Sequence, residues 1–109
     1  MPKDDTLYLN HILDTASKIS QLLSGKTKEE FMREELLIIA ITHLLQVIGE
    51  AANRVSKEFR ERHPEIPISA IIGMRNKIVH DYWDIDEEIV WQTAIMDIPV
   101  LVDKLKEIV

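Results

Sequence analysis

The chain has 109 residues and a formal net charge of −6, with 46% hydrophobic and 29% charged residues. This length allows one folded domain over residues 1–109, and this composition excludes a disordered chain. Cysteine is absent, which excludes a disulfide framework and a thiolate nucleophile and fits a cytoplasmic location. No uninterrupted apolar run approaches the roughly 20 residues that span a bilayer, so a membrane protein is not expected.

The charge is unevenly distributed along the chain. Residues 54–80 carry a net charge of +3, whereas residues 1–53 carry −3 and residues 81–109 carry −6. The acidic balance argues against a broad electrostatic nucleic-acid binder. Any anionic ligand is therefore expected around the middle segment.

The first expected element is a helix. Apolar residues recur at helical spacing from Leu9 to Leu23. Asp4 or Asp5 is expected to cap its N-terminus, and Gly25 to stop it.

A long second helix is expected after Thr27, which forms the sequence of a capping box with Glu30. Its apolar positions continue to Phe59, and it is expected to end before His63. At about 1.5 Å per residue this helix would approach 50 Å. Residues 36–48 are apolar on more than one face, which predicts a second contact surface, most simply a homodimer interface.

Two further helices complete the expected fold. Pro67 fits the first turn of a helix that continues to Val79. Asp84, with an acidic residue three positions on, is expected to start the last helix. Pro99 is expected to kink that helix because proline cannot donate to the carbonyl of Ile95. The pattern predicts an all-α fold, an antiparallel up-and-down bundle of four to five helices.

The residues best suited to chemistry lie in segment 73–83. Arg75 continues an apolar stripe. An arginine at such a position must be paired with an acidic group, extend its charged end to solvent, or serve a function. Asn76 lies one helical turn before His80 on the same face, and Lys77 adds positive charge. On an ideal helix Arg75 and His80 point roughly 140° apart. They meet at one phosphate only if the helix ends or distorts between them, or if two subunits share a site.

The element Arg75-Asn76-x-x-x-His80-x-Tyr82 resembles the signature of HepT-like toxins in the HEPN superfamily. The resemblance covers almost the whole chain. It includes the helical order, the stretch 48–54, the turn 64–67, the Gly-Met-Arg-Asn block and the acidic start of the last helix.

This resemblance implies a HEPN-like homodimer that acts as a metal-independent endoribonuclease and needs no cofactor. His80 would serve as general acid or base, a role that suits an imidazole at neutral pH. Arg75 would hold the scissile phosphate, with Asn76 and Lys77 as supporting contacts to phosphate or RNA. The protein would be the toxin of a type VII toxin–antitoxin system. Tyr82 resembles the acceptor for AMP units that an MntA-type nucleotidyltransferase antitoxin adds.

Structural roles stay open for each of these residues. Arg75 could clamp carboxylates of the acidic last helix, and His80 could cap the third helix as a cation near its C-terminus. Tyr82 and Trp83 could be ordinary core or interface aromatics.

Two alternative functions and one polar seam also stay open. The chain could be a non-catalytic helical partner or nucleotide-binding subunit of a minimal nucleotidyltransferase, or a purely structural dimeric bundle. The seam follows the second expected helix at near-heptad spacing and would line a cleft beside the motif, form a buried dimer seam or face solvent. Its members are His43, Gln46, Glu50, Asn53 and Lys57.

Overall fold

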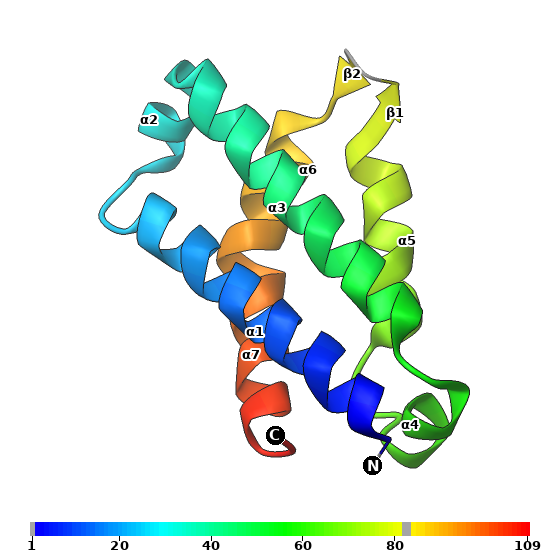
Figure 1. Ribbon diagram of the computed structural model, residues 1–109. Coiled ribbons are helices and arrows are strands. Elements are labelled where there is room, and N and C mark those ends of the chain that lie inside the picture. The colour runs from blue at the N-terminus through cyan, green and yellow to red at the C-terminus, as the bar shows by residue number, and fades with distance from the viewer. Residues whose placement is uncertain (1, 82–83) are drawn as a thin grey trace.

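The computed structural model describes residues 2–81 and 84–109, and of residues 75, 76 and 79–81 it describes the backbone. Most of the described chain is helical, which confirms the all-α class (Figure 1). The elements are α1 (Lys3–Leu23), α2 (Lys28–Arg33), α3 (Glu35–Arg54), α4 (Lys57–Arg62), α5 (Ile68–Ile78), β1 (Val79–Asp81), β2 (Asp84–Ile85), α6 (Glu87–Gln92), the π-helical segment η1 (Thr93–Asp97) and α7 (Ile98–Lys106).

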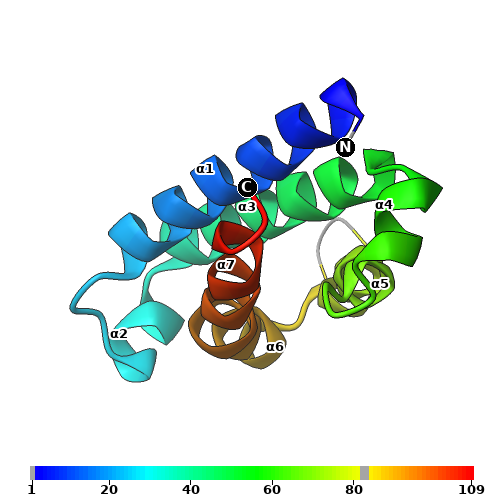
Figure 2. The ribbon, with the colours of Figure 1, turned by 90° about the horizontal axis from the view of Figure 1, so that it is seen from below.

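The helices pack around α3. Helix α1 lies antiparallel beside α3, and α5 packs against α3 as well (Figures 1 and 2). The column made of α6, η1 and α7 contacts α1, α3 and α5. Buried side chains from every α-helix form one core, in which Phe31 of α2 and Phe59 of α4 are the largest fully buried residues.

Helix α1 begins earlier than expected. Its N-cap is Pro2, so the prediction of Asp4 or Asp5 as the cap is wrong. The Asp5 carboxylate is instead buried and accepts hydrogen bonds from Ser56, far along the chain. The predicted stop is confirmed, because the helix ends at Leu23 and Gly25 has a positive φ of 75°.

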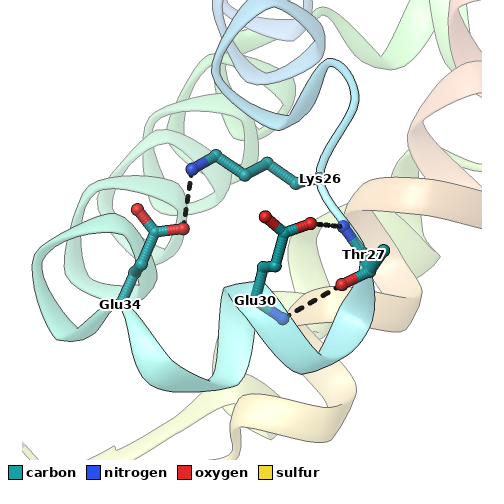
Figure 3. A network of polar contacts seen from close by, with 4 residues as sticks. All are labelled: Lys26, Thr27, Glu30 and Glu34. Carbon is teal, nitrogen blue, oxygen red and sulfur yellow. Dashed lines mark hydrogen bonds and ion pairs between the residues drawn. The ribbon is translucent and has the colours of Figure 1, made fainter.

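The prediction of a single long second helix is wrong, because the helix is interrupted twice in that region and forms α2, α3 and α4. The capping box is present: Thr27 Oγ1 accepts from the Glu30 N–H at 3.1 Å, and Glu30 Oε1 accepts from the Thr27 N–H at 3.0 Å (Figure 3). However, α2 ends at Arg33, and Glu34 leaves helical geometry before α3 begins.

The second break follows α3. Ser56 is extended and accepts a hydrogen bond from the Phe59 N–H at 3.1 Å, which starts α4 as a separate helix. Phe59 is buried in the core from this separate helix. The expected end before His63 is confirmed, since α4 ends at Arg62.

The region after α5 also differs from expectation. Pro67 directly precedes α5, and its carbonyl accepts from the Ile71 N–H at 3.0 Å. Asp84 does not start the last helix; it belongs to β2, and Asp86 caps α6. The residues before Pro99 are π-helical in η1, and Pro99 lies in the first turn of α7, whereas the predicted kink of the helix axis stays a prediction.

Helix α3 carries apolar residues on its outer side as well as in the core. Leu36 is 83% exposed and Ile39 is 48% exposed. The structure describes one chain, so the homodimer stays a prediction. By length and composition α3 could cross a membrane, but core helices of soluble proteins share this composition, and much of α3 is buried here.

Candidate active site

Helix α5 carries the first half of the motif. Ile68, Ile71 and Ile78 are buried and hold α5 against the core, with α3 as its main neighbour. Arg75 and Asn76 lie in the last turns of α5, and the side chain of Lys77 is exposed.

The helix ends between Arg75 and His80. Its last residue is Ile78, and Val79–Asp81 continues as an extended strand. The helix thus ends between the two residues, which is one of the two conditions under which they can meet at one phosphate. The separation of roughly 140° on an unbroken helix no longer applies. The same break ends the one-turn relation between Asn76 and His80, which was expected from a continuous helix.

Strands β1 and β2 pair as a two-stranded antiparallel ribbon. The backbone of His80 occupies an irregular position in this ribbon. Val79 pairs with Ile85 and Asp81 pairs with Asp84, so two residue steps on β1 match one step on β2. His80 is the extra residue of this bulge. Bulges of this kind bend a strand locally and recur next to active sites.

The ribbon is tied to the start of α6. The backbone N–H of Asp86 donates to the carbonyl of Ile78 at 3.0 Å. The Asp86 side chain accepts from the Ile89 N–H at 3.2 Å and so caps α6. The predicted start of this helix at Asp84 is wrong by two residues, because Asp86 is the N-cap. An acidic residue three positions before the apolar Ile89 is the sequence feature that indicates this N-cap.

Helix α6 is itself fixed by α2. The rings of Phe31 and Trp91 lie 5.2 Å apart between centroids, and Lys28 Nζ lies 2.7 Å from Glu88 Oε2. Val90 of α6 is fully buried. The pair of strands β1 and β2 is thus flanked by two helices packed into the core, α5 before β1 and α6 after β2.

The charges near the motif have opposite signs on its two sides. Asp84, Asp86, Glu87 and Glu88 follow it and are exposed. Lys77, on the other side, makes no ion pair with the side chains that the structure describes. A phosphate would therefore meet positive charge on the α5 side and repulsion from the start of α6.

Several of the basic side chains in segment 54–80 form ion pairs or hydrogen bonds within the protein. Lys57 and Arg62 form ion pairs with glutamates of their own helix, at 3.8 and 3.3 Å. The Arg60 guanidinium donates to the carbonyls of Ala52 and Asn53, at 3.4 and 3.2 Å, and so satisfies the end of α3.

The members of the polar seam are mostly exposed in the part of the chain that the structure describes. His43, Glu50 and Asn53 are exposed on α3, and Gln46 is half-buried. Lys57 belongs to the separate helix α4. Whether the seam lines a cleft beside the motif, forms a dimer seam or faces solvent stays a prediction.

The remaining predictions on the motif concern residues or side chains that the structure does not describe. Tyr82 and Trp83 connect β1 and β2 and lie outside the described residues. The side chains of Arg75, Asn76 and His80 are likewise not described, so the expected contacts to an anion stay predictions. Within the described part of the chain, no three His, Asp or Glu residues are grouped to hold a metal ion.

Comparison with known proteins places the chain among relatives of matching length. The family model described as "Ribonuclease HepT-like" matches residues 12–108. A protein of Caldanaerobacter subterraneus named "Putative RNase" is 38% identical over 101 residues, covering 93% of this chain and 90% of its own. A "Probable ribonuclease HepT" of Thermococcus cleftensis is 31% identical over 101 residues, covering 93% and 92%. No solved structure matches the chain.

Proposed function

Because the chain belongs to the HepT-like ribonuclease family, we propose that it is an endoribonuclease that cleaves RNA without a metal ion through Arg75 and His80. The observation that carries the proposal is the end of α5 at Ile78. Arg75 therefore lies in a helix and His80 in a bulged strand. The roughly 140° angle that a continuous helix would impose between the two side chains no longer applies.

The chemistry follows from the two side-chain types. His80 takes the proton of an RNA 2′-hydroxyl, and that oxygen attacks the neighbouring phosphorus. The bond from phosphorus to the 5′-oxygen of the next nucleotide breaks, and the leaving oxygen takes a proton from water. The guanidinium of Arg75 binds the phosphate oxygens, where negative charge increases in the transition state. The products are a 2′,3′-cyclic phosphate end and a 5′-hydroxyl end.

Two neighbouring residues support this reaction. Asn76 orients the phosphate or the imidazole, and Lys77 contributes a positive charge that is exposed and has no ion-pair partner among the described side chains. The local charge matters because the chain as a whole is acidic, with a net charge of −6.

The active form is proposed to be a cytoplasmic homodimer of HEPN-like domains. The exposed Leu36 and Ile39 on α3 offer apolar surface for a second copy. A dimer gives a second way for a guanidinium and an imidazole to converge, one from each protomer.

Control of the nuclease is proposed to act through Tyr82. An MntA-type nucleotidyltransferase antitoxin would transfer AMP to its hydroxyl, as in a type VII toxin–antitoxin system. The phosphate of each AMP adds negative charge two residues from His80. The adduct is also bulky, so RNA would be excluded by both charge and size.

The test compares RNA cleavage in EDTA by the wild type, Arg75→Ala and His80→Ala. We expect each substitution to reduce the rate by at least about 100-fold. Arg33→Ala and His11→Ala are matched controls, because both side chains are exposed and lie outside the motif. A folded, unmodified wild type that cleaves no RNA would reject the proposal and favour a non-catalytic partner of a nucleotidyltransferase. Unchanged cleavage by both motif variants would also reject it.

A further inference from the structure

Asp86 joins the end of α5 to the start of α6 through two of its own groups. Its N–H donates to the carbonyl of Ile78, the last residue of α5, at 3.0 Å. Its side-chain carboxylate accepts from the Ile89 N–H at 3.2 Å, in the first turn of α6. The same residue thus holds the point where the helix of Arg75 becomes the strand of His80 and the point where the next helix begins.

The ribbon needs this support because it is short. Strand β1 has three residues and β2 has two. An isolated two-stranded ribbon is marginal at best in water, and this one contains a bulge. Its geometry therefore depends on how its two ends are held.

Both ends are anchored in the core. Ile78 is fully buried at the end of α5, and Val90 is fully buried in α6. Ile85, which precedes Asp86, is half-buried and packs against the core. Asp86 itself is exposed. Asp86 is thus held in place by hydrogen bonds rather than by burial, so a substitution there changes the connection between α5 and α6 without leaving a cavity in the core.

We propose that Asp86 is a positioning residue for the ribonuclease reaction: its cap on α6 fixes the backbone at Ile78 and thereby the bulge at His80. This proposal rests on the proposed function. Loss of the cap lets the first turn of α6 fray, and the Asp86 N–H then moves away from the carbonyl of Ile78. The backbone of His80, two residues later, shifts with it. Displacement of a reacting group by about 1 Å can reduce a rate by about 100-fold.

The test uses two variants at this position. Asp86→Ala removes the cap, whereas Asp86→Asn keeps a side-chain oxygen that caps nearly as well. We expect Asp86→Ala to lower kcat by roughly 10- to 100-fold with little change in KM for RNA. We expect Asp86→Asn to stay within about twofold of the wild type, since the effect depends on the cap rather than on the charge.

A matched control separates positioning from a general loss of stability. Ser56 caps α4, which has six residues like α6 and leads into the opposite end of α5. Ser56→Ala also removes a bond to the buried Asp5, so its Tm should fall at least as much as that of Asp86→Ala. We expect Ser56→Ala to keep the wild-type kcat at temperatures where it is folded. An equal loss of kcat in Ser56→Ala, or a normal kcat in Asp86→Ala, would overturn the proposal.

Amide hydrogen exchange gives a readout that does not depend on activity. The backbone N–H of residue 86 should be protected in the wild type and in Asp86→Asn, and should exchange faster in Asp86→Ala. Unchanged protection in Asp86→Ala would show that the cap does not hold the ribbon and would overturn the proposal. A wild type that cleaves no RNA would reject the proposed function, whereas this exchange measurement would still decide whether Asp86 fixes the backbone.

Discussion

The carboxylate of Asp5 accepts two hydrogen bonds from Ser56, which lies 51 residues later in the chain. Oδ1 accepts from the backbone N–H at 2.8 Å, and Oδ2 accepts from the side-chain hydroxyl at 2.6 Å. Asp5 is only 2% exposed. The contact joins the first turn of α1 to the break between α3 and α4, so it holds together the end of the molecule opposite the ribbon (Figure 1).

Asp5→Ala should destabilise the protein strongly. It leaves the Ser56 N–H without its partner at a partly buried position, which should lower the free energy of unfolding by about 2–3 kcal/mol. For a chain of this size that corresponds to a fall in Tm of roughly 10–20 °C. Asp4→Ala is the control, because Asp4 is the exposed neighbour in the same turn and should cost less than about 1 kcal/mol. Similar losses in the two variants, measured by thermal and urea unfolding, would contradict this role of Asp5.

The same contact shows what sequence patterns predict and what they miss. Apolar periodicity predicted α1 and the helix after Pro67, and the spacing of Thr27 and Glu30 predicted the capping box, because each pattern depends on residues within one or two turns. The prediction of Asp5 as a helix cap failed because its partner, Ser56, is distant in the chain.

The helix breaks were missed for a related reason. Helical periodicity continues through Glu34 and Ser56, and it does not reveal that Phe31 and Phe59 enter the same core from separate helices. At the candidate site, sequence patterns predicted that α5 would end near His80. The bulge and the role of Asp86 depend on pairing between strands of three and two residues, a length at which no periodic signal exists.

The capping box predicts a pH dependence in the acid range. The hydrogen bond from the Thr27 N–H holds the pKa of the Glu30 carboxylate below its usual 4.5. A lowered pKa means that the carboxylate contributes stability above pH 4.5, and that this contribution is lost as the pH falls through the folded-state pKa. Glu30→Gln keeps an accepting oxygen but does not titrate.

The measurement is the urea midpoint of wild type and Glu30→Gln as a function of pH. We expect the advantage of the wild type to shrink as the pH falls below about 4.5. Glu29→Gln is the control, since Glu29 makes no hydrogen bond with the described residues. A difference between wild type and Glu30→Gln that stays constant from neutral to acid pH would refute this assignment.

The apolar outer side of α3 predicts the effect of charge on assembly. Leu36→Glu and Ile39→Lys place charges on the surface proposed for a second copy, where burial of an unpaired charge is unfavourable. We expect either variant to raise the dissociation constant of the homodimer by at least about tenfold in sedimentation equilibrium, with the helical content unchanged. Leu7→Glu, at an exposed leucine of α1, should leave assembly unchanged. A dimer that persists in both α3 variants would place the interface elsewhere.

Modification by a nucleotidyltransferase partner should depend on one tyrosine. The chain has two tyrosines, Tyr8 and Tyr82, so each can be replaced by phenylalanine as the control for the other. With an MntA-type transferase and ATP, Tyr82→Phe should gain no AMP in intact-mass spectrometry, whereas Tyr8→Phe should gain it as the wild type does. Equal adenylylation of Tyr82→Phe would show that the acceptor is another residue.

The most direct test of the account is the chemical identity of the RNA ends formed in EDTA. If His80 activates the 2′-hydroxyl and Arg75 binds the phosphate, a 5′-labelled oligoribonucleotide should give fragments that end in a 2′,3′-cyclic phosphate. The same sequence with a 2′-deoxyribose at the cleavage position should remain intact. Fragments that end in a 3′-hydroxyl, or cleavage of the deoxy-substituted strand, would contradict the proposed mechanism.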